Sequence, residues 1–276
     1  MEALRPAAVA GTFYPARAGS LAADVQGYLD AVPIGRAAPP KAIVVPHAGY
    51  VYSGPVAASA YARLADVRSV IRRVLLLGPA HRVAVRGLAA PAARGFVTPL
   101  GTVTVDADAV ASALTLPQVC VSAPAHALEH SLEVQLPFLQ TLLGEFRVAP
   151  FVVGSATPDD VAGLLDLLWG GAETLIVVST DLSHYHRYEE AGAIDRETAR
   201  RVLALTPDLE HDEACGATPL NGLLVCARRR GLRPELLDLR NSGDTAGDRS
   251  RVVGYAAFSF CAQLPSAAAA RAQGAP

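Results

Sequence analysis

The stretch Ala42-Ile43-Val44-Val45-Pro46-His47-Ala48-Gly49 indicates the fold class. Its first four residues are all apolar, as is typical of a strand that is buried on both faces. The apolar run then stops at a proline and a histidine, so the strand ends in a polar loop. Strands of this kind occur in parallel sheets that are covered by helices on both sides.

The same pattern recurs along the chain. Further strands are expected at 74–77, 148–153, 175–178, 236–239 and 252–260, with amphipathic or apolar helical segments at 20–29, 55–64, 107–114, 128–143, 158–169, 188–205 and 219–230. Strands that alternate with helices predict an α/β fold with a mostly parallel central sheet and helices on both faces. The turn Thr98-Pro99-Leu100-Gly101 interrupts this alternation and predicts a hairpin over 96–105.

No linker divides the chain. Residues 1–264 are therefore expected to form a single domain, followed by an Ala-, Gly- and Pro-rich tail at 265–276 that is expected to be disordered.

Composition excludes several classes of function. The net charge of −2 gives no reason to expect binding to nucleic acid or to an anionic membrane. The four cysteines form no CxxC pair, which argues against a disulfide framework, a zinc ribbon or an iron–sulfur cluster. No signal-peptide core and no apolar run of about 20 residues is present, so a cytoplasmic protein is expected.

Histidines follow three of the expected parallel strands. His47, His81 and His184 each lie a few residues beyond a strand end. In an open parallel sheet the ligand site lies at the carboxyl ends of the strands. A single histidine there is more often a capping or packing residue, but three at equivalent positions favour a shared site. Several imidazoles together suit iron, copper, zinc or nickel rather than magnesium or calcium.

Cys215 and Asp181 are the other candidates for this site. Cys215 precedes an expected helix, whose N-terminus would lower the thiol pKa, whereas the other three cysteines lie in apolar surroundings. Asp181 could orient a ligating histidine, bind the metal, or only cap a helix. His126 and His130 have i, i+4 spacing but lack the glutamate of HExxH, so a structural role is expected for His126 while that of His130 stays open.

Seven segments in consistent order resemble the Memo family, whose prokaryotic members are called AmmeMemoRadiSam system protein B. They are Arg5-Pro6-Ala7-Ala8-Val9-Ala10-Gly11-Thr12-Phe13-Tyr14-Pro15, Val45-Pro46-His47-Ala48-Gly49-Tyr50 with Ser53-Gly54, Leu77-Gly78-Pro79-Ala80-His81, Glu129-His130-Ser131-Leu132-Glu133, Ser179-Thr180-Asp181-Leu182-Ser183-His184, Cys215-Gly216 and Val252-Val253-Gly254-Tyr255.

The resemblance implies a fold like that of class III extradiol dioxygenases, which are non-haem iron enzymes. It implies His47, His81 and Cys215 as metal ligands, the cysteine replacing a carboxylate, and His184 as the acid/base residue with Asp181 near it. The metal would be iron or copper, with zinc less suited. Radical-SAM and AMMECR-type proteins are implied as partners.

Two main functions remain open. The first is a metal-dependent oxidoreductase whose small-molecule substrate would face Tyr50, Tyr52, His130 and Arg249, with Arg82 and Tyr255 as further candidates. The second is a non-catalytic adaptor that recognises a peptide or a partner enzyme through the same pocket. A zinc hydrolase without redox activity is a third hypothesis. The chain lacks the GxSxG, GxxxxGK[ST] and GxGxxG motifs, which argues against a serine hydrolase, a P-loop NTPase and a Rossmann dehydrogenase.

Overall fold

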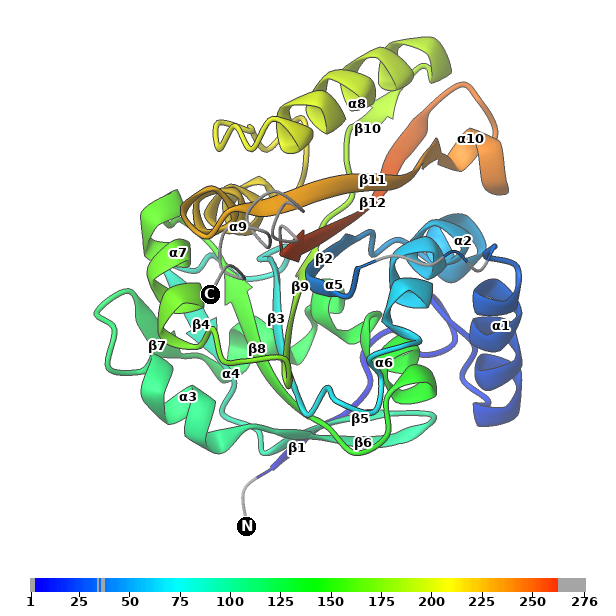
Figure 1. The fold of residues 1–276 in the computed structure, drawn as a ribbon. Helices are drawn as coiled ribbons and strands as arrows, with labels where there is room; N and C mark the ends of the chain where they lie inside the picture. Colours follow the sequence, from blue (N-terminus) through cyan, green and yellow to red (C-terminus); the bar gives the residue numbers. More distant parts are fainter. Residues whose placement is uncertain (1–2, 34, 36–37, 263–276) are drawn as a thin grey trace, which may run out of the picture.

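A computed structural model describes residues 3–33, 35 and 38–262, and in it these residues are built around one mixed sheet (Figure 1). Within these residues the sheet has 12 strands, with the order β1-β5-β6-β8-β3-β9-β2-β12-β10 along its main path. The expected tail at 265–276 lies outside the described residues.

Four parallel strands form the centre of the sheet: β2 (Pro40–Val45), β9 (Thr174–Ser179), β3 (Arg73–Pro79) and β8 (Arg147–Val153). Because they are parallel, their carboxyl ends meet at one edge. The remaining strands are β1 (Leu4–Arg5), β4 (Leu88–Ala90), β5 (Gly95–Thr98), β6 (Gly101–Val105), β7 (Val119–Val121), β10 (His184–His186), β11 (Leu232–Asn241) and β12 (Val252–Ala262).

Strands β11 and β12 pair antiparallel with each other, and β12 pairs antiparallel with β2. They extend the sheet on the side of β2, and β10 pairs with β12 at that end. The sheet is thus mostly parallel at its centre and antiparallel toward this edge. Strands β5 and β6 form the hairpin expected at 96–105.

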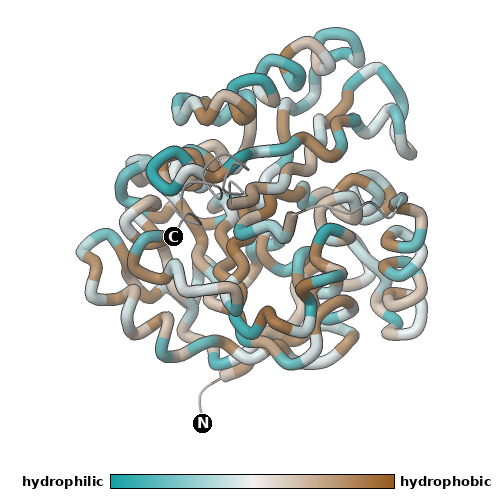
Figure 2. Tube along the Cα trace, viewed as in Figure 1, coloured by the Kyte–Doolittle hydropathy of each residue, from teal (hydrophilic) through white to brown (hydrophobic). Residues whose placement is uncertain are grey.

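Successive residues of the central strands point to opposite faces and enter two separate cores. In β3, Val74 and Leu76 join one core, whereas Leu75 and Leu77 join the other. Helices α1 (Ala18–Asp30), α2 (Tyr50–Tyr61) and α6 (Leu136–Leu142) cover the first face, and α3 (Ala107–Ala113), α7 (Pro158–Leu167) and α9 (Ala217–Arg229) cover the second (Figure 1). Apolar residues accordingly concentrate along the central strands in Figure 2.

The helix expected at 128–143 is in fact two. It divides into α5 (His130–Glu133) and α6, because Pro137 has no backbone N–H and lies in the first turn of α6. Helix α2 begins at Tyr50 rather than at Pro55, and Ser53 does not cap it: the Ser53 hydroxyl donates to the carbonyl of Ala48. The side chains of Asp106 and Thr157 cap α3 and α7 by accepting the backbone N–H groups of Ala109 and Asp160.

The remaining helices are α4 (Ala123–Ala127), α8 (Tyr188–Leu203), α10 (Ser242–Thr245) and the short 3-10 helix η1 (Ala62–Leu64). Among the described residues, no helix combines the length and apolar character that crossing a membrane requires.

Candidate metal centre

A cavity of about 680 Å³ lies beyond the carboxyl ends of the central strands. It collects six of the chain's seven histidines, which are His47, His81, His130, His184, His186 and His211, together with Phe13, Arg82, Asp181, Tyr185, Asp212 and Cys215. The loops after β2, β3 and β9 supply His47, His81 and Asp181. The predicted meeting of three strand ends is therefore present in the structure.

Three of these histidines form a tight cluster. One ring nitrogen from each of His47, His81 and His130 lies within 4.8 Å of the others. The ring centroids are 5.1 Å apart for His47 and His81, and 4.7 Å apart for His81 and His130. This spacing allows three nitrogen ligands to reach one ion.

The hydrogen bonds of Ser179 fix the tautomer of His47. The Ser179 hydroxyl donates its only proton to the carbonyl of Ser131 at 2.6 Å and accepts a hydrogen bond from the Gln135 amide at 2.8 Å. It can therefore only accept from His47 Nδ1, 3.0 Å away. His47 thus carries its proton on Nδ1 and presents the lone pair of Nε2 as an acceptor, toward the sulfur of Cys215 at 3.3 Å.

Glu129 has the same effect on His81. Its carboxylate accepts hydrogen bonds from the His81 backbone N–H at 2.7 Å and from Nδ1 at 2.9 Å. Burial alone would raise the pKa of Glu129, but the hydrogen bonds from His81 and Ser131 outweigh it and lower the pKa to about 2. A permanent carboxylate therefore holds the proton on Nδ1. Carboxylate–histidine pairs of this kind orient metal ligands in many proteins.

His130 is the member of the cluster whose role the sequence did not decide. Its ring packs against Phe13 with centroids 4.7 Å apart, and its Nδ1 is buried without a hydrogen-bond partner among the described residues. An orphaned nitrogen of this kind fits a site that completes its bonding with a ligand. The nearest charged oxygen, Glu129 Oε1, is 3.5 Å away.

Two rings of the cluster, those of His47 and His130, have lowered pKa values. Burial and the neighbouring His81 lower the pKa of His47 well below its usual range, and burial lowers the pKa of His130. Both rings are therefore neutral near pH 7. Neutral imidazoles are the form that binds metals.

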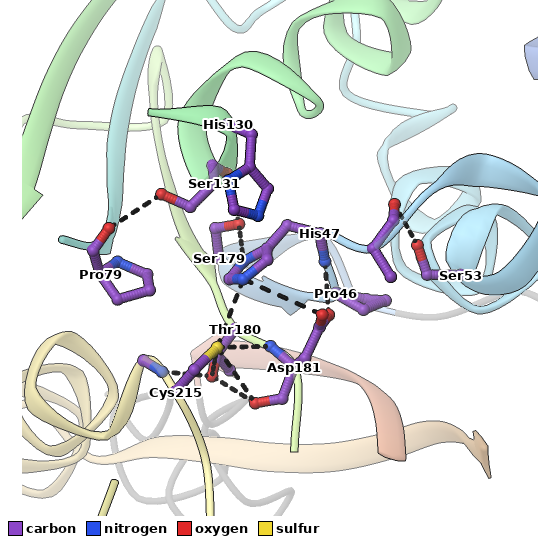
Figure 3. Close-up of polar contacts among 12 residues, drawn as sticks. Pro46, His47, Ser53, Pro79, His130, Ser131, Ser179, Thr180, Asp181 and Cys215 are labelled. Atoms are coloured by element: carbon purple, nitrogen blue, oxygen red, sulfur yellow. Dashed lines mark hydrogen bonds and ion pairs between the residues drawn. The ribbon is translucent and has the colours of Figure 1, made fainter. Parts of the chain in front are cut away.

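Cys215 lies beside His47 on the side away from His130 (Figure 3), with its sulfur 3.3 Å from His47 Nε2. It also accepts a hydrogen bond from the backbone N–H of Asp181 at 3.3 Å. The prediction of a lowered thiol pKa is wrong for the metal-free chain, because burial and the nearby Asp181 carboxylate raise the pKa of Cys215 to about 12.

Asp181 links two of these elements. Its side chain accepts a hydrogen bond from the His47 backbone N–H at 2.7 Å, and its carbonyl accepts one from the Cys215 backbone N–H at 3.2 Å. Burial raises the pKa of the Asp181 carboxyl. Asp181 thus connects the loops after β2 and β9 with the start of α9 and caps no helix.

His184 lines the cavity at the start of β10, outside the three-histidine cluster. Tyr185 beside it adopts φ +63°, a conformation that a bulky side chain seldom takes, and is 64% exposed. Its ring lies between the His184 ring, at 5.7 Å, and the guanidinium of Arg251, at 5.1 Å. The wall of the cavity opposite the cluster is therefore polar, aromatic and accessible.

Several expected substrate-facing residues do not line this cavity. Tyr50 is buried in the core and donates its hydroxyl to the carbonyl of Val134 at 2.6 Å, and Tyr255 is also buried. Tyr52 is exposed outside the cavity, while the guanidinium of Arg249 stacks over the ring of Tyr188 at 4.4 Å. Of this group, Arg82 and His130 remain in contact with the cavity.

The structure places His126, for which a structural role was expected, outside the cavity. Its Nε2 donates to the carbonyl of Ala89 at 2.8 Å. The sequence reasoning missed the supporting residues Ser179, Gln135 and Glu129. The glutamate directly before His130 was the available signal, since a histidine ligand needs an acceptor for its second nitrogen.

Comparison with known proteins identifies the family. A family model described as Memo-like protein matches residues 5–259. The chain belongs to the Memo family. A MEMO1 family protein of Ignicoccus hospitalis is 36% identical, covering 93% of this chain and 98% of that protein. Those of Sulfolobus acidocaldarius and Aeropyrum pernix are 34% and 37% identical, covering 93% and 92% of this chain and 99% and 98% of those proteins.

Among solved structures, an uncharacterized protein from Escherichia coli K12 has a TM-score of 0.51 at 13% identity, covering 78% of this chain and 98% of that one. This likeness concerns the fold alone. In this Memo family member, the segment Glu129-His130-Ser131-Leu132-Glu133 carries both the acceptor for His81 and the third histidine of the cluster.

Proposed function

We propose that this Memo family protein binds iron or copper through His47 and His81, with Cys215 or His130 as the third ligand. The observation that carries the proposal is the cluster of three ligand nitrogens within 4.8 Å. Two of these rings have their Nδ1 protons fixed by neighbours, so binding needs little reorganisation. Imidazole and thiolate ligands suit iron, copper and zinc; we propose iron or copper because the redox function proposed below needs a redox-active metal.

We further propose that the protein is a metal-dependent oxidoreductase. The metal, when bound, supplies a redox-active centre at the base of a cavity large enough for a small molecule. His184 lines that cavity with a partly exposed side chain and can hold or move a proton at a bound substrate. Arg82 and Tyr185 are placed to contact the substrate from the rim.

The first test is elemental analysis of protein purified without oxygen or chelators. We expect near-stoichiometric iron or copper in the wild type and none in His47→Ala. His126→Ala is the matched control, because His126 is a buried histidine outside the cluster. Equal metal content in wild type and His47→Ala would contradict the site.

The third ligand is decided by two further variants. Cys215→Ala is expected to lower the metal content strongly, since the sulfur lies 3.3 Å from His47 Nε2 and becomes a thiolate on binding. If His130 is the ligand instead, His130→Ala loses the metal and Cys215→Ala keeps it. Cys226→Ala is the control, because Cys226 is buried inside α9 and does not line the cavity.

The adaptor function makes a different prediction. Folded wild-type protein that holds no metal, and that resists reconstitution with iron and copper, would favour peptide or partner binding through the same cavity. Metal-dependent consumption of O₂ would favour the oxidoreductase.

A further inference from the structure

Three consecutive residues support all three histidines of the cluster. Glu129 orients His81, His130 is itself a member, and the carbonyl of Ser131 accepts the Ser179 proton that fixes His47. Yet α5, which contains two of them, has only four residues. A helix of one turn has almost no stability of its own, so its position is set by contacts with the rest of the chain.

Arg5 supplies contacts at both ends of this segment. Its guanidinium donates to the carbonyl of His126 at 3.0 Å and to the carbonyl of Glu129 at 2.7 Å, and it pairs with the carboxylate of Glu133. The Arg5 side chain is only 4% exposed. One planar group therefore fixes the path of the chain before and after His130.

Glu133 completes the arrangement from inside α5. It is fully buried and accepts hydrogen bonds from the backbone N–H groups of Ala8 and Val9, at 2.8 and 3.0 Å, and from the Tyr14 hydroxyl at 2.5 Å. These bonds hold the N-terminal turn that carries Phe13. The Phe13 ring packs on His130 and lines the cavity.

We propose that Arg5 and Glu133 form a positioning clamp for the metal centre, although neither lines the cavity. The idea rests on the proposed metal site. A buried ion pair adds little net stability over apolar residues of similar size, because desolvation offsets the attraction. The ion pair instead fixes the geometry of the backbone, since the forked guanidinium and the carboxylate each bind several backbone groups at once. The clamp holds Glu129, His130 and Ser131 where the three imidazoles need them.

The variant that tests the clamp is Arg5→Lys. Lysine keeps the positive charge beside Glu133 but cannot reach both carbonyls with the geometry of a guanidinium. Arg73→Lys is the matched control. Arg73 donates to Asp106 at 2.7 Å, at the opposite end of the strand that leads to His81.

The first measurement is a titration of metal-free protein with Co(II), a spectroscopic probe of nitrogen and sulfur ligands. We expect Arg5→Lys to bind Co(II) about 10- to 100-fold more weakly than wild type and to shift its visible absorption bands. Arg73→Lys is expected to match the wild type in both respects. Wild-type affinity and spectrum in Arg5→Lys would overturn the clamp and leave the pair a structural role.

The second measurement needs no metal. Long-range ¹H–¹⁵N spectra of the metal-free wild type are expected to show His47 and His81 protonated on Nδ1. In Arg5→Lys we expect a mixture of tautomers at His81, while Arg73→Lys keeps a single one. Unchanged spectra in Arg5→Lys would contradict the clamp. If wild type shows the fixed tautomers but binds no Co(II), the metal proposal fails and the positioning of the imidazoles stands.

Tyr14→Phe covers the case in which Arg5→Lys does not fold. It removes one hydrogen bond to Glu133 and leaves both charges in place. We expect a smaller loss of Co(II) affinity, of about 3-fold, with the same direction of spectral shift. A wild-type titration curve for folded Tyr14→Phe would count against the clamp.

Discussion

The two ends of the central strands both carry polar side chains, but of different types and in different settings. At the amino end, Arg73 and Arg147 begin β3 and β8 and lie at the rim of a cavity of about 780 Å³. At the carboxyl end, the cavity is smaller, about 680 Å³, but it contains the histidine cluster. Size alone therefore points to the wrong end of the sheet.

Two aspartates express this difference in their pKa values. Burial alone would raise the pKa of Asp106 at the amino end, but hydrogen bonds from the Ala109 N–H and from Arg73 outweigh it and lower the pKa. At the carboxyl end, burial dominates and raises the pKa of Asp181, which pairs with no arginine in the described part of the chain. At the amino end the charge of Asp106 is thus balanced by Arg73, whereas at the carboxyl end the carboxyl of Asp181 lacks such a partner among the described residues.

The comparison indicates that the carboxyl end of the strands is better suited to bind a cation than the amino end. At the amino end Arg73 and Asp106 already pair and are partly solvated, so a ligand that binds to them would have to displace that bond. The carboxyl end holds neutral imidazoles, an orphaned nitrogen and a buried carboxyl within one cavity. A cation bound there, as proposed, would satisfy groups such as the His130 Nδ1 that have no partner among the described residues.

The largest expected effect concerns catalysis at the carboxyl end. His184→Ala should lower any metal-dependent O₂ consumption by roughly 10²- to 10⁴-fold, because a positioned acid/base group contributes that much. Its metal content should equal that of the wild type, as measured by elemental analysis. Loss of metal in this variant would mean that His184 is a ligand.

The next largest effect is a difference in metal affinity between variants at the two ends of the central strands. Glu129→Gln should weaken metal binding by about 10- to 100-fold, because the amide no longer holds the His81 proton on Nδ1 with a full negative charge. Asp106→Asn should bind metal as the wild type does. Competition against a chelator measures both affinities, and equal losses in the two variants would remove the distinction between the ends.

A stability effect is expected at the amino end. Asp106→Asn keeps a residue that can cap α3 but loses the charge opposite Arg73, so the free energy of unfolding should fall by about 1 kcal/mol at pH 7. Because the folded-state pKa of Asp106 is lowered, its contribution is fully present above the unfolded-state pKa. It is lost as the pH falls through the folded-state value.

Denaturant unfolding of both proteins from pH 7 to pH 2 measures this effect. The difference in stability between wild type and Asp106→Asn should shrink toward the acid end of that range. A difference that does not depend on pH would show that the ion pair with Arg73 is not its source.

The smallest expected effect concerns the stability contributed by Tyr185, which lines the histidine-rich cavity. Tyr185→Asn should raise the free energy of unfolding by about 0.5–1 kcal/mol, because asparagine tolerates the left-handed conformation at φ +63° better than tyrosine does. A loss of stability in denaturant unfolding would mean that the contacts of the ring with His184 and Arg251 outweigh the backbone strain.

The sequence by itself determined the sheet and its functional edge. Short continuous apolar runs such as Ala42–Val45, ended by polar loops, are typical of strands buried on both faces, and parallel strands bring their carboxyl ends together. His47, His81 and His184 could therefore be predicted to lie around one site, since their positions follow from local pattern and topology, and all three line the cavity.

Only the tertiary structure decided which groups complete the site. His130 enters it from a one-turn helix and Glu129 from the residue that caps this helix, where Arg5, more than a hundred residues away in sequence, donates to the Glu129 carbonyl. The thiol of Cys215 has a raised rather than a lowered pKa, because burial and Asp181 outweigh any effect of the helix start. Tyr50 and Arg249 face other partners for the same reason: burial and long-range contacts follow from packing, which local sequence does not specify.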